Sequence, residues 1–189
     1  IDVSLVGSEM CIRDRKKPGG LTKPVVSNLV DDILLVDEQS LEWAVGSLIE
    51  QQRVVSEGAG AAGIAAIRQN PSLFAGKKVG VVICGGNIDP RLLASILNRN
   101  MASDGRLARL RIDISDEPGM LAAITASISR CGGNIVEIYH QRLFYDVPAK
   151  LAKIDAVIET RGPEHVDEII ADLRGSNFLV RQLEDSSAS

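Results

Sequence analysis

The sequence is poor in aromatic residues, which make up 3% of its 189 residues. Few aromatic rings means few platforms on which nucleic-acid bases could stack. An excess of basic residues is missing too, because 21 Lys and Arg residues stand against 25 Asp and Glu residues, for a net charge of −4. Nucleic-acid-binding proteins usually carry a basic excess, so we expect no nucleic acid among the partners of this chain.

Cysteines, histidines and long apolar runs are also scarce. Cys11, Cys84 and Cys131 lack CxxC spacing, and His140 and His165 lie far apart. We therefore expect neither a disulfide framework nor a metal site, and a cytoplasmic location. No window approaches the ~18 consecutive apolar residues of a membrane span, so no membrane is expected as a partner. The remaining composition, 45% hydrophobic and 24% charged, is that of one domain or two small ones.

The first fifteen residues, IDVSLVGSEMCIRDR, do not match the rest of the chain. They show no sustained apolar period and no basic region ahead of an apolar stretch, so they do not fit a signal peptide. They resemble an adapter-derived artefact of sequence assembly, and a flexible native arm is the alternative. We expect 1–15 to be non-native or disordered, two domains over 16–103 and 104–185, and a tail over 186–189.

The region 16–103 mixes strand and helix signals. The apolar run Val30–Val36 predicts a strand. Asp37 suits the N-cap of an amphipathic helix over Glu38–Arg53, because its carboxylate can accept from free amides of the first turn. The small residues of Ser56–Ile67 predict a helix that packs very closely on a neighbour.

The stretch around a Cys-Gly-Gly-Asn sequence is the most informative. Val79–Ile83 is a nearly continuous apolar run, which predicts a strand covered on both faces of a parallel sheet. Cys84–Asn87 then turn the chain, and Asp89 and Pro90 begin a helix. Ligands of open α/β sheets collect at the carboxyl ends of strands, and glycine lets the backbone approach them. A plain tight turn and a buried cysteine are the alternatives.

Two spaced motifs carry a family resemblance. VSEGAGAAGIAA at 55–66, followed by VVICGGNIDP at 81–90, resembles the threonine dehydratases (threonine ammonia-lyases). These are enzymes that use pyridoxal 5′-phosphate and have the α/β tryptophan-synthase-β-like fold, fold type II. The resemblance implies that the thiol of Cys84 sits against the pyridine nitrogen of the cofactor. The candidate cofactor-binding residues are Cys84, Gly85, Gly86, Asn87 and Glu57.

The resemblance is incomplete, because the Schiff-base lysine and the glycine-rich phosphate loop of the family are not recognisable in this sequence. A largely neutral thiol would not hold the pyridine nitrogen protonated, which fits β-elimination. We therefore expect a C-terminal portion of the enzyme that has no catalytic residue of its own and is inactive alone. None of the lysines of this region lies in the family's lysine motif: Lys16, Lys17, Lys23, Lys77 and Lys78.

The region 104–185 predicts the order βαββαβ, the α+β ferredoxin-like plan. Alternating apolar and charged residues mark the strands, and glycines mark the helix ends. Pro118 suits the first turn of the first helix, and Gly132-Gly133 end that helix with one residue in the left-handed conformation. The predicted strands are Arg109–Ile114, Asn134–Phe144, Lys153–Thr160 and Phe178–Val180, and the helices begin at Ser115–Leu121 and at Gly162-Pro163.

This region resembles the ACT domain, through D-x-P-G-x-L at Asp116–Leu121 and GGNI at Gly132–Ile135. ACT domains bind small amino acids and regulate metabolic enzymes. A helix N-terminus favours a carboxylate, Asp116 could accept from an ammonium group, and Asn134 can donate and accept. A helix cap and a chain turn are the alternatives for these two side chains. The candidate effector-binding residues are Asp116, Gly119, Met120, Leu121, Asn134 and Ile135.

Together the two resemblances imply the C-terminal portion of a threonine ammonia-lyase. The complete enzyme would convert L-threonine to 2-oxobutanoate and ammonia, and an amino acid such as isoleucine or valine would act as its effector. Exposed sheet edges favour a homo-oligomer, a dimer or a tetramer. The alternatives are a non-enzymatic ACT-type amino-acid sensor and a serine-specific dehydratase of fold type II.

Overall fold

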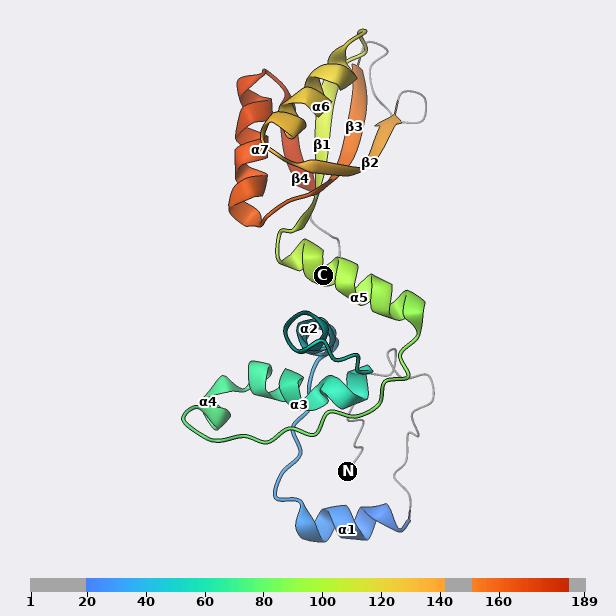
Figure 1. The fold of residues 1–189 in the computed structure, drawn as a ribbon, viewed down its shortest axis with the longest axis vertical. Coiled ribbons are helices and arrows are strands. Elements are labelled where there is room, and N and C mark those ends of the chain that lie inside the picture. Colours follow the sequence, from blue (N-terminus) through green and yellow to red (C-terminus); the bar gives the residue numbers. More distant parts are fainter. Residues whose placement is uncertain (1–19, 142–150, 184–189) are drawn as a thin grey trace. The chain divides into compact units, whose positions relative to one another are not determined.

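A computed structural model describes residues 20–141 and 151–183 of the chain (Figure 1). These residues form two compact units, the first ending at Asn100 and the second beginning at Met101. The segments 1–15 and 186–189 lie outside the described residues. Across 20–141 and 151–183, no helix is both long and apolar enough to cross a bilayer.

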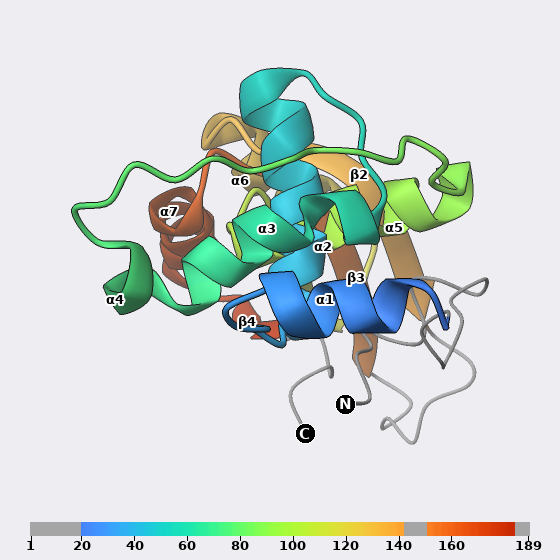
Figure 2. The ribbon, with the colours of Figure 1, turned by 90° about the horizontal axis from the view of Figure 1, so that it is seen from below.

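The first unit is built from helices, and it has no strand among its described residues. Its core joins α2, α3 and α5 through side chains such as Leu41, Ala61 and Ile96, which are fully buried. Figure 2 shows α3 crossing α2. The helices are α1 (Thr22–Leu29), α2 (Glu38–Ser47), the π-helical η1 (Leu48–Gln52), α3 (Gly58–Gln69), α4 (Pro71–Phe74) and α5 (Pro90–Ser103), the last of which runs on past Asn100.

Two of the predicted helices are confirmed in detail. The Asp37 carboxylate caps α2, with 2.7 Å between its Oδ1 and the backbone nitrogen of Ser40. The helix then continues through η1 and ends at Arg53, which has the left-handed φ of 59°. On α3, Ala61 and Ala65 are fully buried against α2, so the small residues allow the close packing that the sequence predicts.

The two predicted strands of this unit are wrong. Val30–Val36 has no strand and instead follows α1, a helix that the sequence analysis missed. Val79–Ile83 also has no strand, and Val82 is 84% exposed. A β-strand needs a neighbouring strand with which to exchange backbone hydrogen bonds. The described residues of this unit supply no such strand to either segment. The partial α/β fold of this region therefore stays a prediction.

The second unit has the predicted ferredoxin-like fold. Its four strands form one antiparallel sheet in the order β2-β3-β1-β4. Side chains such as Ile112, Ile154 and Leu173 fill the core between the sheet and the two helices, which lie on the same face (Figure 1). The elements are β1 (Leu107–Ser115), α6 (Met120–Arg130), β2 (Asn134–Gln141), β3 (Leu151–Glu159), α7 (Pro163–Gly175) and β4 (Leu179–Leu183).

The ends of α6 differ in how well the sequence predicts them. The helix begins at Met120, so Pro118 precedes it and is not in its first turn, contrary to expectation. Gly119 has a φ of 95°, and this left-handed conformation turns the chain into the helix only at the next residue. At the other end Gly132 adopts the predicted left-handed conformation, with a φ of 84°.

Candidate functional site

The two motifs of the first unit lie against each other in what we call the cofactor corner, residues 55–60 and 84–87. The backbone N–H of Glu57 donates to the carbonyl of Gly85 at 2.7 Å. The hydroxyl of Ser56 donates to the carbonyl of Cys84 at 3.2 Å and to that of Glu57 at 3.0 Å. The fold therefore joins two segments that are nearly thirty residues apart in the sequence.

Two glycines make this close approach possible. A β-carbon on Gly60 would collide with the carbonyl group of Cys84. Gly85 has a φ of 70°, and a β-carbon there would collide with the carboxylate of Glu57. Both positions therefore require glycine. Gly60 has no space for a β-carbon, and Gly85 has neither the space nor a backbone conformation that other residues readily adopt.

The corner leaves the predicted cofactor residues accessible. Cys84, Gly85, Gly86 and Asn87 are exposed, and Glu57 is half-buried. The thiol of Cys84 is therefore accessible to solvent. Sequence reasoning missed Ser56, which is fully buried and fastens the corner through its two hydrogen bonds. No signal in the neighbouring residues could have found it, because the Cys84 carbonyl lies 28 residues away in the sequence.

The predicted effector residues lie at two ends of the sheet. In register, Asn134 pairs with Glu159, which pairs with Leu107 at the start of β1. Asp116 follows Ser115 at the other end of β1, and at 3.3 Å per residue the two ends of β1 are roughly 26 Å apart. One module therefore does not bring Asn134 and Asp116 around a single small ligand.

The local contacts of these residues are simple. The Asn134 side-chain amide donates to the Glu159 carboxylate at 2.9 Å, and Ile135 packs on the core. Leu121 is 37% exposed on the first turn of α6. Met120, by contrast, lines a groove. The effector roles of all six residues stay predictions.

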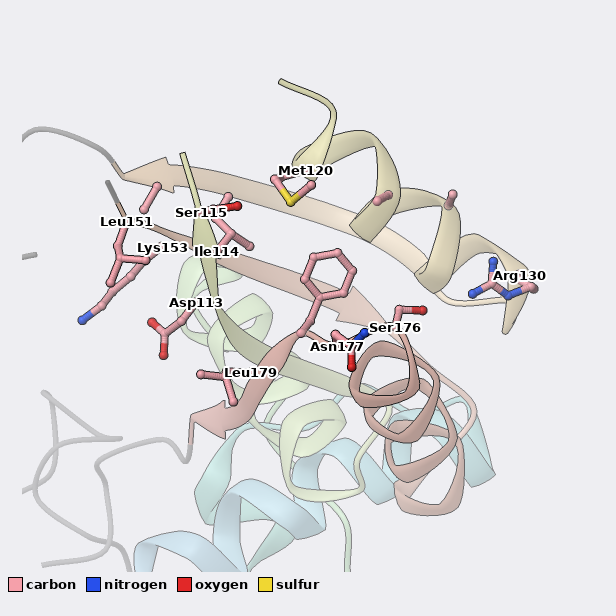
Figure 3. A pocket seen from close by; sticks show the side chains of 14 residues that line it. Asp113, Ile114, Ser115, Met120, Arg130, Leu151, Lys153, Ser176, Asn177 and Leu179 are labelled. Atoms are coloured by element: carbon pink, nitrogen blue, oxygen red, sulfur yellow. The ribbon is translucent and has the colours of Figure 1, made fainter. Parts of the chain in front are cut away.

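The groove beside α6 lies within the second unit and has a volume of about 930 Å³ (Figure 3). In Figure 3, Asp113, Leu151 and Lys153 lie at one end of the groove, Arg130, Ser176 and Asn177 lie at the other, and Met120 lies between them. The rest of the lining is mostly apolar. The lining residues are Asp113, Ile114, Ser115, Met120, Ala123, Ala126, Arg130, Leu151, Ala152, Lys153, Ser176, Asn177, Phe178 and Leu179.

A buried ion-pair cluster lies on β1 and β3 and was missed by the sequence analysis. Asp155 is completely buried, and it accepts hydrogen bonds from Arg111 and Arg109 on the neighbouring strand. The hydrogen bonds from Arg111, and then those from Arg109, hold the pKa of the Asp155 carboxyl below its ordinary value. The alternation of charges on the two strands was a signal for the pairing, but not for the burial.

His165 has a structural role in the second unit. Its Nδ1 accepts from the backbone N–H of Arg161 at 3.1 Å, and its Nε2 lies 2.8 Å from the carbonyl oxygen of Cys131. Both contacts are satisfied when the imidazole carries its proton on Nε2, because Nε2 then donates to the Cys131 carbonyl and Nδ1 accepts from Arg161. Throughout the described ranges, no three His, Cys, Asp or Glu side chains are grouped so that they could hold a metal ion.

Most of the chain is similar in sequence to one group of enzymes. The chain is 38% identical over 166 residues to an L-threonine ammonia-lyase of Thermotoga maritima, which is 88% of this chain and 41% of that protein. It is 34% identical over 165 residues to an L-threonine ammonia-lyase of Geobacter sulfurreducens, which is 87% of this chain and 41% of that protein. The chain therefore spans less than half the length of these relatives.

Other comparisons cover shorter stretches. The catabolic L-threonine dehydratase TdcB of Staphylococcus aureus is 34% identical over 91 residues, 47% of this chain and 26% of that protein. The crystal structure of the ACT domain from GTP pyrophosphokinase of Chlorobium tepidum has 24% identity and a TM-score of 0.34, over 41% of this chain and 96% of that chain. No family model matches the chain. The sequence similarity confirms, over most of the chain, the predicted resemblance to the threonine ammonia-lyases.

Proposed function

We propose that the chain is the C-terminal portion of a threonine ammonia-lyase and that the complete enzyme converts L-threonine to 2-oxobutanoate and ammonia. The observation that carries this proposal is the 38% identity to an L-threonine ammonia-lyase over 166 residues. The geometry of the cofactor corner supports it, because both matching motifs take part in one hydrogen-bonded arrangement. The second unit would act as an ACT-type regulatory module, on the grounds of its ferredoxin-like sheet order and its D-x-P-G-x-L motif.

In this proposal the cofactor corner forms one wall of a pocket for pyridoxal 5′-phosphate, whose ring acts as an electron sink when it is bound. The exposed Cys84 thiol would face the ring nitrogen as a weak, neutral partner. Gly85 and Gly86, which have no side chains, would let the backbone approach the ring, and Asn87 would lie beside it. Ser56 and Glu57 would hold the thiol in place, because they bind the backbone carbonyls of Cys84 and Gly85 directly after it.

A chimera tests the proposal directly. The matching 166 residues of the Thermotoga maritima enzyme are replaced by the equivalent part of this chain, and 2-oxobutanoate is measured with L-threonine and with L-serine. We expect formation of 2-oxobutanoate from L-threonine, whereas the purified chain alone, given L-threonine and pyridoxal phosphate, forms none. Turnover of L-serine but not L-threonine would support the serine-specific alternative.

The outcome that contradicts the proposal is also clear. A folded chimera that shows the visible absorbance of bound pyridoxal phosphate, but forms no keto acid from either substrate, would remove the lyase assignment. Release of 2-oxobutanoate by the chain alone would contradict the expected inactivity of this portion. Cys84→Ser in the chimera is the matched control, because a serine hydroxyl is also a small neutral partner, and we expect it to keep most of the activity.

A further inference from the structure

One face of the four-stranded sheet has no covering element among the described residues of the second unit. Both helices, α6 and α7, lie on the other face (Figure 1). The even-numbered residues of β1, β3 and β4, such as Ile112 and Ile154, fill the core on that side. Successive side chains of a strand point to opposite faces. The odd-numbered residues of these three strands, together with the β2 residues paired with them, therefore form what we call the open face.

The open face carries large apolar side chains. Leu179 is 74% exposed, Tyr139 is 49% exposed and Leu151 is 46% exposed. Figure 3 shows the side chains of Leu179, Asp113 and Lys153 pointing away from α6. A sheet face that stays in water usually carries polar residues, so exposed apolar side chains at this place favour a covering partner.

The charged side chains of the open face stand in rows that cross the strands. In one row Lys153 of β3 is paired with Asp113 of β1. In the next row Asp155 of β3 is paired with Arg111 of β1. In both rows the charge on β3 is therefore opposite to the charge on β1.

This arrangement makes the open face complementary to a second copy of itself. A two-fold axis parallel to the strands, between β3 and β1, lays β3 of one copy over β1 of the other and keeps each row opposite the same row. Lys153 then faces Asp113 of the other copy, and Asp155 faces Arg111 of the other copy. Lys153 and Arg111 also interact within their own chain, and contacts from a second copy add to these because that copy approaches from above the sheet.

The edge strands fit the same symmetry. Tyr139 of β2 stands in the row of Asp155, and Arg181 of β4 stands in the row of Arg111. Because β2 of one copy lies over β4 of the other, the Tyr139 ring faces the Arg181 guanidinium group, as in a cation–π pair. A two-fold axis across the midpoint of the strands would instead stack Arg111 on Arg111 and Asp155 on Asp155. The charges therefore favour the axis parallel to the strands.

We propose that the open face packs on the open face of a second copy of this chain, about a two-fold axis parallel to the strands. Facing sheets pack about 10 Å apart with their strands within about 30° of each other, which brings the side chains of the two faces into contact. This dimer differs from the assembly through exposed sheet edges that the sequence predicts. It concerns the assembly of the chain and goes beyond the proposed function.

Sedimentation equilibrium on the full chain tests the dimer by measuring its dissociation constant. Asp113→Lys places a lysine opposite Lys153 of the other copy, and the like charges should weaken the dimer about 10-fold or more. Lys153→Glu places a glutamate opposite Asp113 and should weaken it to the same extent. The double variant, which combines both changes, exchanges the two charges and should restore most of the affinity.

A third variant and a control separate the open face from general charge effects. Leu179→Ser removes exposed apolar surface without changing the charge, and should also weaken the dimer. Asp167→Lys makes the same charge change as Asp113→Lys on the exposed side of α7, and should leave the dissociation constant unchanged. Circular dichroism verifies that each variant is folded.

Two results would overturn the proposal. One is a wild-type chain that stays monomeric at every concentration, and the other is a dimer whose dissociation constant is unchanged in the folded variants Asp113→Lys, Lys153→Glu and Leu179→Ser. A folded double variant that dimerises no better than the single variants would contradict the two-fold axis that pairs these rows. The chimera decides the lyase proposal independently of all these outcomes.

Discussion

Arg111 and Asp155 face each other across β1 and β3 through two hydrogen bonds of 2.7 Å each, from Nε to Oδ1 and from Nη2 to Oδ2. Arg109 adds a third hydrogen bond, 2.9 Å long, to Oδ2. The carboxylate is completely buried, although it lies on the sheet face opposite the helices, and both arginine side chains bind it. A paired guanidinium fork of this kind binds a carboxylate with two parallel hydrogen bonds and compensates its charge.

Removing the Asp155 charge should destabilise the second unit. Asp155→Asn leaves two arginine side chains without their shared carboxylate, and breaking a buried pair in this way costs about 3 kcal/mol. Urea unfolding followed by circular dichroism measures the change in the free energy of unfolding. Asp167→Asn on the exposed face of α7 is the control, and should shift the midpoint very little. Equal stability of the two variants would show that the cluster is not stabilising.

The same carboxylate should make stability depend on pH. The hydrogen bonds from Arg111 hold the pKa of Asp155 below its ordinary value in the folded chain. A depressed folded pKa contributes stability that is present above the unfolded pKa and is lost as the pH falls through the folded pKa. We expect the difference in unfolding free energy between the wild type and Asp155→Asn to shrink in acid. A difference that stays constant between pH 7 and pH 2 would contradict this.

The N-cap of α2 gives a local prediction in the first unit. Asp37→Ala removes the acceptor of the Ser40 backbone N–H, and loss of such a cap costs about 1 kcal/mol. The hydrogen bond from the Ser40 backbone also lowers the pKa of Asp37, so this contribution should fade in acid. Thermal melts of the full chain measure the effect. Asp31→Ala, an exposed aspartate outside any helix, should melt like the wild type.

A methyl group added at Gly60 of the cofactor corner should destabilise the chain. An alanine in a helix is usually more stable than a glycine, by about 1 kcal/mol. At Gly60, however, the added β-carbon would collide with the carbonyl of Cys84, so we expect Gly60→Ala to destabilise the chain by about 1–3 kcal/mol. Gly80→Ala is the control, because a β-carbon there meets no atom within 4 Å. A gain in stability at Gly60 would mean that the two segments do not touch.

The two described cysteines should differ in reactivity. Cys84 is exposed, whereas Cys131 is half-buried, and burial raises the pKa of its thiol, helped by the nearby carboxylates of Asp172 and Glu168. Since the thiolate is the reactive form, iodoacetamide should alkylate Cys84 at least 10-fold faster than Cys131. Mass spectrometry on a Cys11→Ser variant measures both rates without interference from the third cysteine. Comparable rates would show that the corner is closed.

Long-range features of the cofactor corner could be predicted only in part. The motifs placed Glu57 and Cys84 in one site by resemblance, and the structure joins their segments through the Gly85 carbonyl. The predicted strand Val79–Ile83 was wrong, because an apolar run indicates that a segment is buried but does not identify the elements that would cover it. Ser56 was missed, because nothing in a serine's immediate sequence shows that its hydroxyl will reach a carbonyl 28 residues away.

The sequence by itself determined the features that depend on a few neighbouring residues. The Asp37 cap, the left-handed Gly132 and the βαββαβ order all follow from local hydrogen bonding, backbone freedom and apolar periodicity. Only the tertiary structure decided which side chains meet across the sheet. Strand register placed Asp155 between two arginines more than forty residues away, and the short β4 opened the groove at Asp113. Register depends on how all four strands and both helices share one core, so no single segment of the sequence carries it.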